Sequence, residues 1–207
     1  MAVAKPKRLL SYGGKRLDGQ RWTWQLTKEQ CEALIKAAYR ASFDGQPFNR
    51  FITLLWERAG IDGRQAAAAT GRFIKLASDW ARRHGYRLIW AWVQEWGAVH
   101  GAHIHLLLHV PANLDWQFRL MPRRWAKHCL GGSYVKGTVD SKRIKAGWFG
   151  FNYEGALKWR VHYMLKYAPA DLERELAMTG KGPKPWGRKG QTYGKRLAIW
   201  QKKRFLK

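Results

Sequence analysis

The pattern of apolar and polar positions along the chain predicts a mixture of helices and strands. Short runs rich in β-branched and aromatic residues are typical of buried strands, whereas apolar residues recurring every three or four positions are typical of helices. The strands predicted in this way are residues 50–56, 86–95, 102–109 and 133–138, with shorter ones at 21–26 and 147–152. The predicted helices are residues 27–42, 63–84, 114–130, 154–167 and 171–178.

Local signals mark several of these boundaries. Thr27 and Gln30 have the spacing of a capping box, and Asp62 directly precedes the helix at 63–84. Gly97 and Gly101 predict a tight turn between two strands. Strands 86–95 and 102–109 should therefore form an antiparallel hairpin.

The second strand of this hairpin carries two histidines at alternate positions. Residues i and i+2 of a strand share a face, so His103 and His105 should project side by side while Ile104 points the other way. Two imidazoles on a rigid strand form a half-site for a divalent metal. Two core histidines satisfied by hydrogen bonds would give the same pattern.

A carboxylate at the end of the first hairpin strand bears on this choice. The turn brings Glu95 toward the histidine pair, and one carboxylate with two imidazoles is a ligand set for Mg²⁺, Mn²⁺ or Zn²⁺. The alternative is a solvent-facing glutamate at a strand end. His109 lies on the same face, where it is either a further ligand or a packed residue near the strand end.

The predicted helix at 154–167 carries a third candidate element. Tyr163, Lys166 and Tyr167 lie along one helical face. With a metal to polarise a phosphate and a cation to favour the phenolate, a tyrosine can attack a phosphodiester and form a covalent phosphotyrosine. A tyrosine pair that only packs against the core is the alternative.

The charge of the chain indicates the class of partner. Its 207 residues include 39 Lys and Arg against 14 Asp and Glu, a formal net charge of +25, which implies a polyanion. No acidic residue follows Glu175, so the end of the chain should be a basic tail able to contact phosphates. The 13 tryptophans either fill the core, as we expect for most of them, or stack unpaired bases.

The compartment follows from what the sequence lacks. No apolar run approaches the roughly 18 residues of a membrane-spanning helix, and the N-terminus has no apolar region of a signal peptide. Cys31 and Cys129 are two isolated cysteines, which suit a reducing environment. We therefore expect a cytoplasmic protein without a membrane partner.

Taken together, the candidate residues resemble a known superfamily. Glu95, the pair His103 and His105, and Tyr163 with Lys166 occur in the order and approximate spacing of the HUH endonucleases. The hairpin looks most like that of the rolling-circle replication initiators of plasmids and small phages, and residues 51–55 match the place of their first motif. The resemblance covers about residues 48–170.

This resemblance implies an α+β fold of ferredoxin-like kind, with a central antiparallel sheet flanked by helices. It implies Mg²⁺ or Mn²⁺ held by Glu95, His103 and His105, and attack by Tyr163 on single-stranded DNA at an origin. The products would be a 5′-phosphotyrosine and a free 3′-OH primer. Lys166 would offset charge developing on the phosphate or the phenolate.

The tyrosine pair resembles that of the two-tyrosine initiators of small phages, in which Tyr167 would accept the strand when a round closes. Ala168 and Pro169 follow where another lysine is often found, so Tyr167 is either catalytic or structural. The chain has no phosphate-loop motif to power strand separation, so a host helicase is the expected partner.

Three other functions compete with this one. A histidine-triad hydrolase would need a third alternating histidine, where the chain has Leu107. A non-catalytic, basic single-stranded nucleic-acid-binding protein would not require the candidate residues to converge, and a transposase or relaxase of the same superfamily would. For the chain as a whole we expect a basic N-terminal arm and helix at 1–47, the nuclease core at 48–170 and the basic tail at 171–207.

Overall fold

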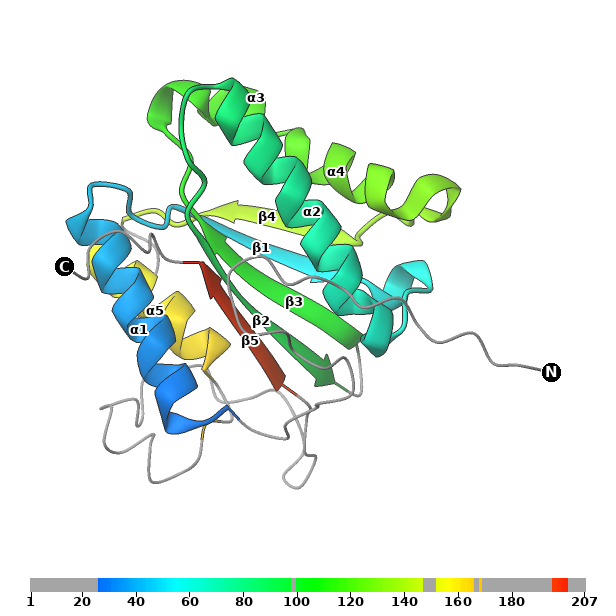
Figure 1. Cartoon of the computed structure of the whole chain (residues 1–207), viewed down its shortest axis with the longest axis horizontal. Coiled ribbons are helices and arrows are strands. Elements are labelled where there is room, and N and C mark those ends of the chain that lie inside the picture. The colour runs from blue at the N-terminus through cyan, green and yellow to red at the C-terminus, as the bar shows by residue number, and fades with distance from the viewer. Residues whose placement is uncertain (1–25, 98–99, 147–151, 166–167, 169–194, 201–207) are drawn as a thin grey trace.

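The computed structural model describes residues 26–97, 100–146, 152–165, 168 and 195–200. At its centre is a five-stranded antiparallel sheet with the strand order β4-β1-β3-β2-β5 (Figure 1). The strands are β1 (Arg50–Leu55), β2 (Trp90–Gly97), β3 (Gly101–Leu108), β4 (Val139–Arg143) and β5 (Lys195–Trp200).

Helices cover both faces of this sheet. On one face lie α2 (Gly63–Arg83), α3 (Asp115–Phe118) and α4 (Met121–Leu130), and on the other lie α1 (Lys28–Phe43) and α5 (Tyr153–Met164) (Figure 1). The short 3₁₀ turns are η1 (Glu57–Ala59), η2 (Ala112–Leu114) and η3 (Gly131–Ser133). None of the described helices has both the length and the apolar character needed to cross a membrane.

The chain order β1-α2-β2-β3-α4-β4 with the spatial order β4-β1-β3-β2 is the split βαβ arrangement of ferredoxin-like folds. The predicted α+β class and the ferredoxin-like sheet flanked by helices are therefore confirmed. β5 extends this sheet beyond β2, with Glu95 opposite Lys195 in the register. This added strand was not predicted, because residues 195–200 follow a long basic stretch punctuated by glycine and proline.

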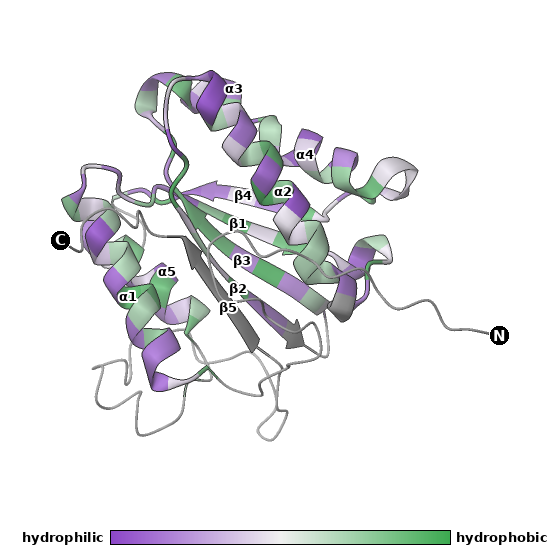
Figure 2. Cartoon of the chain, in the orientation of Figure 1, coloured by the Kyte–Doolittle hydropathy of each residue, from purple (hydrophilic) through white to green (hydrophobic). Residues whose placement is uncertain are grey.

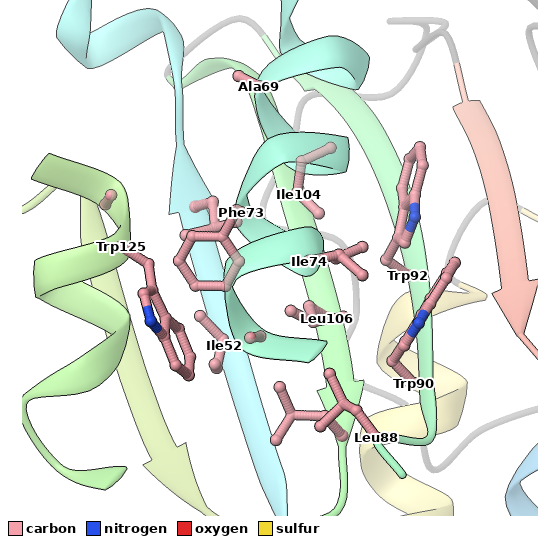
Figure 3. Packing of buried hydrophobic residues seen from close by; sticks show 14 of the residues in the cluster. Ile52, Ala69, Phe73, Ile74, Leu88, Trp90, Trp92, Ile104, Leu106 and Trp125 are labelled. Atoms are coloured by element: carbon pink, nitrogen blue, oxygen red, sulfur yellow. The ribbon is translucent and has the colours of Figure 1, made fainter. Parts of the chain in front are cut away.

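Alternating positions on the strands divide the interior into two apolar clusters. Ile52 and Leu106 face α2 and α4, where they pack with Phe73 and Trp125 (Figure 3). Phe51, together with the odd-numbered positions of β3, faces α1 and α5. The hairpin histidines therefore lie in the layer between the sheet and α5.

Five described tryptophans belong to the apolar cluster beneath α2 and α4, which confirms that packing is their main role. They are Trp56, Trp80, Trp90, Trp92 and Trp125. Trp90 and Trp92, two residues apart on β2, point into this cluster side by side (Figure 3).

β4 forms the hydrophilic edge of the sheet (Figure 2). Four of its five residues are exposed, and charges on an edge strand oppose pairing with another chain. Arg143 on β4 and the buried Arg50 on β1 both form ion pairs with Asp115. These pairs fasten the start of α3 to the two strands.

The capping predictions are confirmed at both helix starts. The Thr27 hydroxyl accepts a hydrogen bond from the Gln30 amide, and the Gln30 side chain accepts one from the Thr27 amide. The Asp62 carboxylate accepts a hydrogen bond from the Gln65 amide at the start of α2. These contacts satisfy amides that the first helical turn leaves without a partner.

Two predicted elements are wrong. Residues 134–138 form a turn rather than a strand, because Gly137 adopts a positive φ of 90° and Thr138 folds back onto the Val135 carbonyl. The single helix predicted at 114–130 is divided into η2, α3 and α4. Pro122 stands in the first turn of α4, where a proline begins a helix but cannot continue one.

Other boundaries differ by a few residues. β2 begins at Trp90 rather than at residue 86, and α5 ends at Met164 with its capping residue Leu165. Leu26 is not in a strand. Most of the predicted strands at 21–26 and 147–152, and all of the helix at 171–178, lie outside the described residues.

Candidate functional site

The register of the β2–β3 hairpin brings the three predicted ligands together. Glu95 stands directly opposite His103, and Val93 stands opposite His105. All three candidate side chains are buried, with exposed fractions of 2% for Glu95, 7% for His103 and 3% for His105. The prediction that the turn places Glu95 across from the histidine pair is confirmed.

The ligand atoms of these residues form a compact group. The His103 Nε2 and His105 Nε2 atoms lie 3.4 Å and 3.9 Å from the same carboxylate oxygen, Glu95 Oε2. One ligand atom from each of the three residues can be chosen so that all lie within 4.8 Å of one another. With metal–ligand bonds near 2.0–2.2 Å, such separations fit three donors around one ion. We call this set the Glu-His-His cluster.

Hydrogen bonds to the other imidazole nitrogens set which nitrogen faces the cluster. His103 Nδ1 lies 2.9 Å from the carbonyl oxygen of Gly101, an acceptor, so Nδ1 carries the proton and donates. His105 Nδ1 lies 3.2 Å from the hydroxyl oxygen of Thr53 on β1. With both protons on Nδ1, the Nε2 lone pairs are directed at the cluster, as a metal-binding histidine requires.

Thr53 is a functional candidate that the sequence analysis missed. It pairs with His105 across β1 and β3, so its hydroxyl reaches the imidazole from the neighbouring strand. The available signal was a single hydroxyl residue within the apolar run 51–56.

The turn preceding His103 is held by an acidic side chain from η1. The Glu57 carboxylate accepts a hydrogen bond from the Ala102 amide. Gly101 has a positive φ of 57°, and a Cβ added there would collide with the Glu57 carboxylate. A glycine is therefore needed at this end of β3, where the carbonyl of the same residue holds His103.

Tyr163 lies against the cluster. Its ring centroid is 5.0 Å from that of His105, at an interplanar angle of 73°, and 6.1 Å from that of Phe51. Trp159, one helical turn earlier on α5, stacks on Tyr163 at 5.6 Å. Neighbouring rings thus hold Tyr163 on the side of α5 that faces the sheet.

Arg160 is a second candidate that the sequence analysis missed. Its guanidinium carbon lies 4.5 Å above the Phe51 ring and 4.7 Å from the Trp159 ring, and its exposed fraction is 6%. Burial lowers the pKa of Arg160 to about 10, against the opposing attraction of Tyr163 and Asp140. Since this value is well above 7, the side chain remains a cation beside the tyrosine. Its position three residues before Tyr163 on the same helix was the signal in the sequence.

The remaining candidates separate into two groups. Lys166 and Tyr167 lie outside the described residues. His109 is not part of the cluster, because its Nδ1 donates a 2.7 Å hydrogen bond to the Pro47 carbonyl. His100 is exposed in the turn, with its ring centroid 6.2 Å from that of His103.

Comparison with known protein families supplies the final observation. The family model of the replication-associated protein of ORF2 type matches residues 49–171, which is more than half of the chain. The chain belongs to this family. The match includes the Glu-His-His cluster, Thr53, Arg160 and Tyr163, so the residues that the fold gathers are within the part that defines the replication-associated protein.

Family membership confirms the resemblance to the rolling-circle replication initiators and supports a role in DNA replication for this replication-associated protein. It also supports a nuclease-type enzyme that binds DNA. Searches of curated proteins and of solved structures returned no match to the chain.

Proposed function

We propose that this replication-associated protein is a metal-dependent endonuclease and strand transferase that nicks single-stranded origin DNA and so initiates rolling-circle replication. The observation that carries the proposal is the packing of Tyr163 against His105 of the buried Glu-His-His cluster. A tyrosine placed beside a group able to bind a cation is the arrangement that phosphodiester transesterification needs.

In this proposal Glu95, His103 and His105 hold Mg²⁺ or Mn²⁺. The donor set fits, because the cluster offers one carboxylate oxygen and two imidazole Nε2 lone pairs from a buried, hydrogen-bonded group. When bound, the ion polarises the scissile phosphate and withdraws charge from its non-bridging oxygens.

Tyr163 is the proposed nucleophile. Its phenolic oxygen loses its proton and forms a bond to phosphorus, while the bond from phosphorus to the 3′ oxygen breaks. The 3′ oxygen takes up a proton, which leaves a free 3′-OH primer and a 5′-phosphotyrosine. The Arg160 cation favours the phenolate form of Tyr163, and Lys166 offsets charge on the phenolate or the phosphate.

Tyr167 is the proposed acceptor for the second strand transfer that closes a round. In that step Tyr167 attacks a newly made origin, and the released 3′-OH attacks the first phosphotyrosine and rejoins the DNA. Strand separation is assigned to a host helicase, with the protein acting on DNA in the cytoplasm.

The competing functions make different demands. A non-catalytic single-stranded nucleic-acid-binding protein would not need the tyrosine, the cation and the cluster side by side. A transposase or relaxase of the same superfamily would need them, and the match to a replication-associated family favours replication over both.

The test uses labelled single-stranded oligonucleotides from the origin of the genetic element that encodes the protein, incubated with the full chain and Mn²⁺. We expect a covalent protein–DNA adduct that disappears with EDTA and in Tyr163→Phe. Tyr39→Phe is the matched control, because Tyr39 is an exposed tyrosine on α1. Glu95→Gln should remove the adduct and weaken Mn²⁺ binding measured by calorimetry.

Two results would contradict the proposal. An adduct that persists in Tyr163→Phe and disappears in Tyr167→Phe would reassign the nucleophile. If the wild-type protein forms no adduct with any origin strand in Mn²⁺ or Mg²⁺, the non-catalytic binding protein becomes the better hypothesis.

A further inference from the structure

A pocket of about 420 Å³ opens at the C-terminal end of α4. Its lining residues are Arg123, Lys127, Gly131, Gly132, Tyr134 and Lys136. We call it the basic pocket. It lies in the layer of α2 and α4, across the sheet from α1, α5 and the Glu-His-His cluster (Figure 1).

The basic pocket combines one aromatic ring with several cations. The guanidinium carbon of Arg123 and the ammonium nitrogen of Lys127 lie 5.7 Å and 5.6 Å from the Tyr134 ring centroid, within the range of cation–π attraction. Tyr134 is half-buried and packs against the core, whereas both cations are exposed. The ring is therefore held in place beside solvent-exposed positive charges.

The charge around the pocket has one sign. Between Asp115 and Asp140 the sequence contains five Lys and Arg residues and no acidic one. Gly131 and Gly132 add no side chain, and nothing lies within 4 Å of the position where a Cβ of either would stand. A negatively charged group can therefore approach the backbone as well as the cations.

The basic pocket lies at the same end of the sheet as the cluster. The carbonyl of Thr138, which follows the pocket segment, accepts a 2.8 Å hydrogen bond from the Leu55 amide, and Leu55 pairs with His103. Between them is η1, where Arg58 lies so near Gly137 that a Cβ added there would be 3.2 Å from its guanidinium carbon. A DNA strand leaving the cluster around this end would pass Arg58 before it reaches the pocket.

We propose that the basic pocket binds one nucleotide of single-stranded DNA outside the nicking site. The base stacks on Tyr134, and the phosphate lies among Arg123, Lys127 and Lys136. The DNA partner rests on the proposed function, but the site uses none of the residues assigned to cleavage. Its effect is to hold the strand after the tyrosine has reacted, and to add affinity that does not depend on a metal.

The test measures DNA binding with chemistry removed. Full-length Tyr163→Phe is titrated against fluorescent oligothymidylate in EDTA at several salt concentrations, followed by anisotropy. The double variant Lys127→Ala/Lys136→Ala should lower the slope of log affinity against log salt by about 1.4, since each phosphate contact on a single strand contributes roughly 0.7. Lys36→Ala/Arg83→Ala removes the same charge from exposed positions on α1 and α2 and should change the slope far less.

A second variant isolates the stacking contact. Tyr134→Leu keeps an apolar side chain against the core but removes the ring, and should weaken binding of single strands roughly 5- to 100-fold. Tyr134→Phe keeps the ring and should bind as the parent protein does. Duplex DNA of the same length should show no loss from Tyr134→Leu, because paired bases are not available to stack. Thermal melting confirms that each variant is folded.

Either of two outcomes would overturn the proposal. One is a salt slope for Lys127→Ala/Lys136→Ala equal to that of the Lys36→Ala/Arg83→Ala control. The other is single-strand affinity unchanged by Tyr134→Leu, or lost equally on duplex. Failure of the proposed nicking function would appear separately, as the absence of a covalent adduct from the wild-type protein.

Discussion

The contact between Thr53 and His105 gives the sharpest test of the proposed metal site. Thr53→Val keeps the shape of the side chain and removes the hydroxyl that lies 3.2 Å from His105 Nδ1. His105 is only 3% exposed, so bulk water cannot readily replace the lost partner. The imidazole proton then gains by moving to Nε2, which lies 3.9 Å from Glu95 Oε2. That tautomer presents no lone pair to an ion.

The size of the effect follows from this geometry. A neutral hydrogen bond contributes about 1 kcal/mol, or roughly fivefold in affinity, whereas losing the partner of a metal-binding histidine lowers affinity about 10- to 100-fold. Since 3.2 Å is at the long end for a hydrogen bond, we expect the lower limit, about tenfold weaker Mn²⁺ binding.

Isothermal titration of Mn²⁺ into Thr53→Val, Thr53→Ser and wild type measures this change. Thr53→Ser retains the hydroxyl and should bind within about threefold of wild type, since the hydrogen bond persists. If Thr53→Val binds Mn²⁺ as tightly as wild type while its melting temperature is unchanged, the hydroxyl does not select the tautomer and the argument is refuted.

Three further predictions concern the core, the tyrosine and the histidines. Phe73→Ala should lower the free energy of unfolding by about 3–5 kcal/mol in urea titrations, because Phe73 is fully buried between Trp56 and Trp125, whereas Phe43→Ala at an 84% exposed position should change it by less than about 0.5 kcal/mol. Arg160→Leu should slow adduct formation on the order of 10²-fold with Mn²⁺ binding unchanged, and Arg160→Lys should recover part of the rate; equal rates in all three proteins would remove Arg160 from the mechanism. Burial lowers the pKa of His162 below its usual 6.5, so the unfolded chain binds more protons than the folded one as pH falls through that value, and stability should fall from pH 7.5 to 5.5. His162→Gln should show a smaller loss over that range, and an identical loss would assign the acid sensitivity to other groups.

The candidate site was predictable to the extent that it is local. Glu95, His103 and His105 lie on one hairpin, so a turn signal and the two-residue period of strands were enough to bring them together. Thr53 reaches His105 across a pair of strands separated by 52 residues, and no local pattern gives the register of such a pair. Arg160 was hidden for another reason, since an arginine on a helix is usually exposed and only the rings of Phe51 and Trp159 show that it is buried.

The fold was predictable where one face of an element is buried. β1, α2 and β3 have strong apolar patterns because each packs against the core. β4 is an exposed edge with the sequence Val139 to Arg143, mostly polar, and so it gave no alternation and the prediction fell on the preceding turn. β5 has a partner on β2 that is about one hundred positions earlier, and such non-local pairing is not written into the local sequence.

The hairpin that carries the cluster has a consequence for the order in which the protein folds. Glu95 and His103 are eight positions apart in the chain, so their pairing closes a short loop at little entropic cost. Tyr163 follows His103 by sixty positions and meets the cluster only after β4 and α5 have docked. Because contacts between nearby residues form faster than distant ones, we expect the candidate metal ligands to assemble early and the tyrosine to arrive late. A partly folded chain would then be able to hold an ion before it is able to attack DNA.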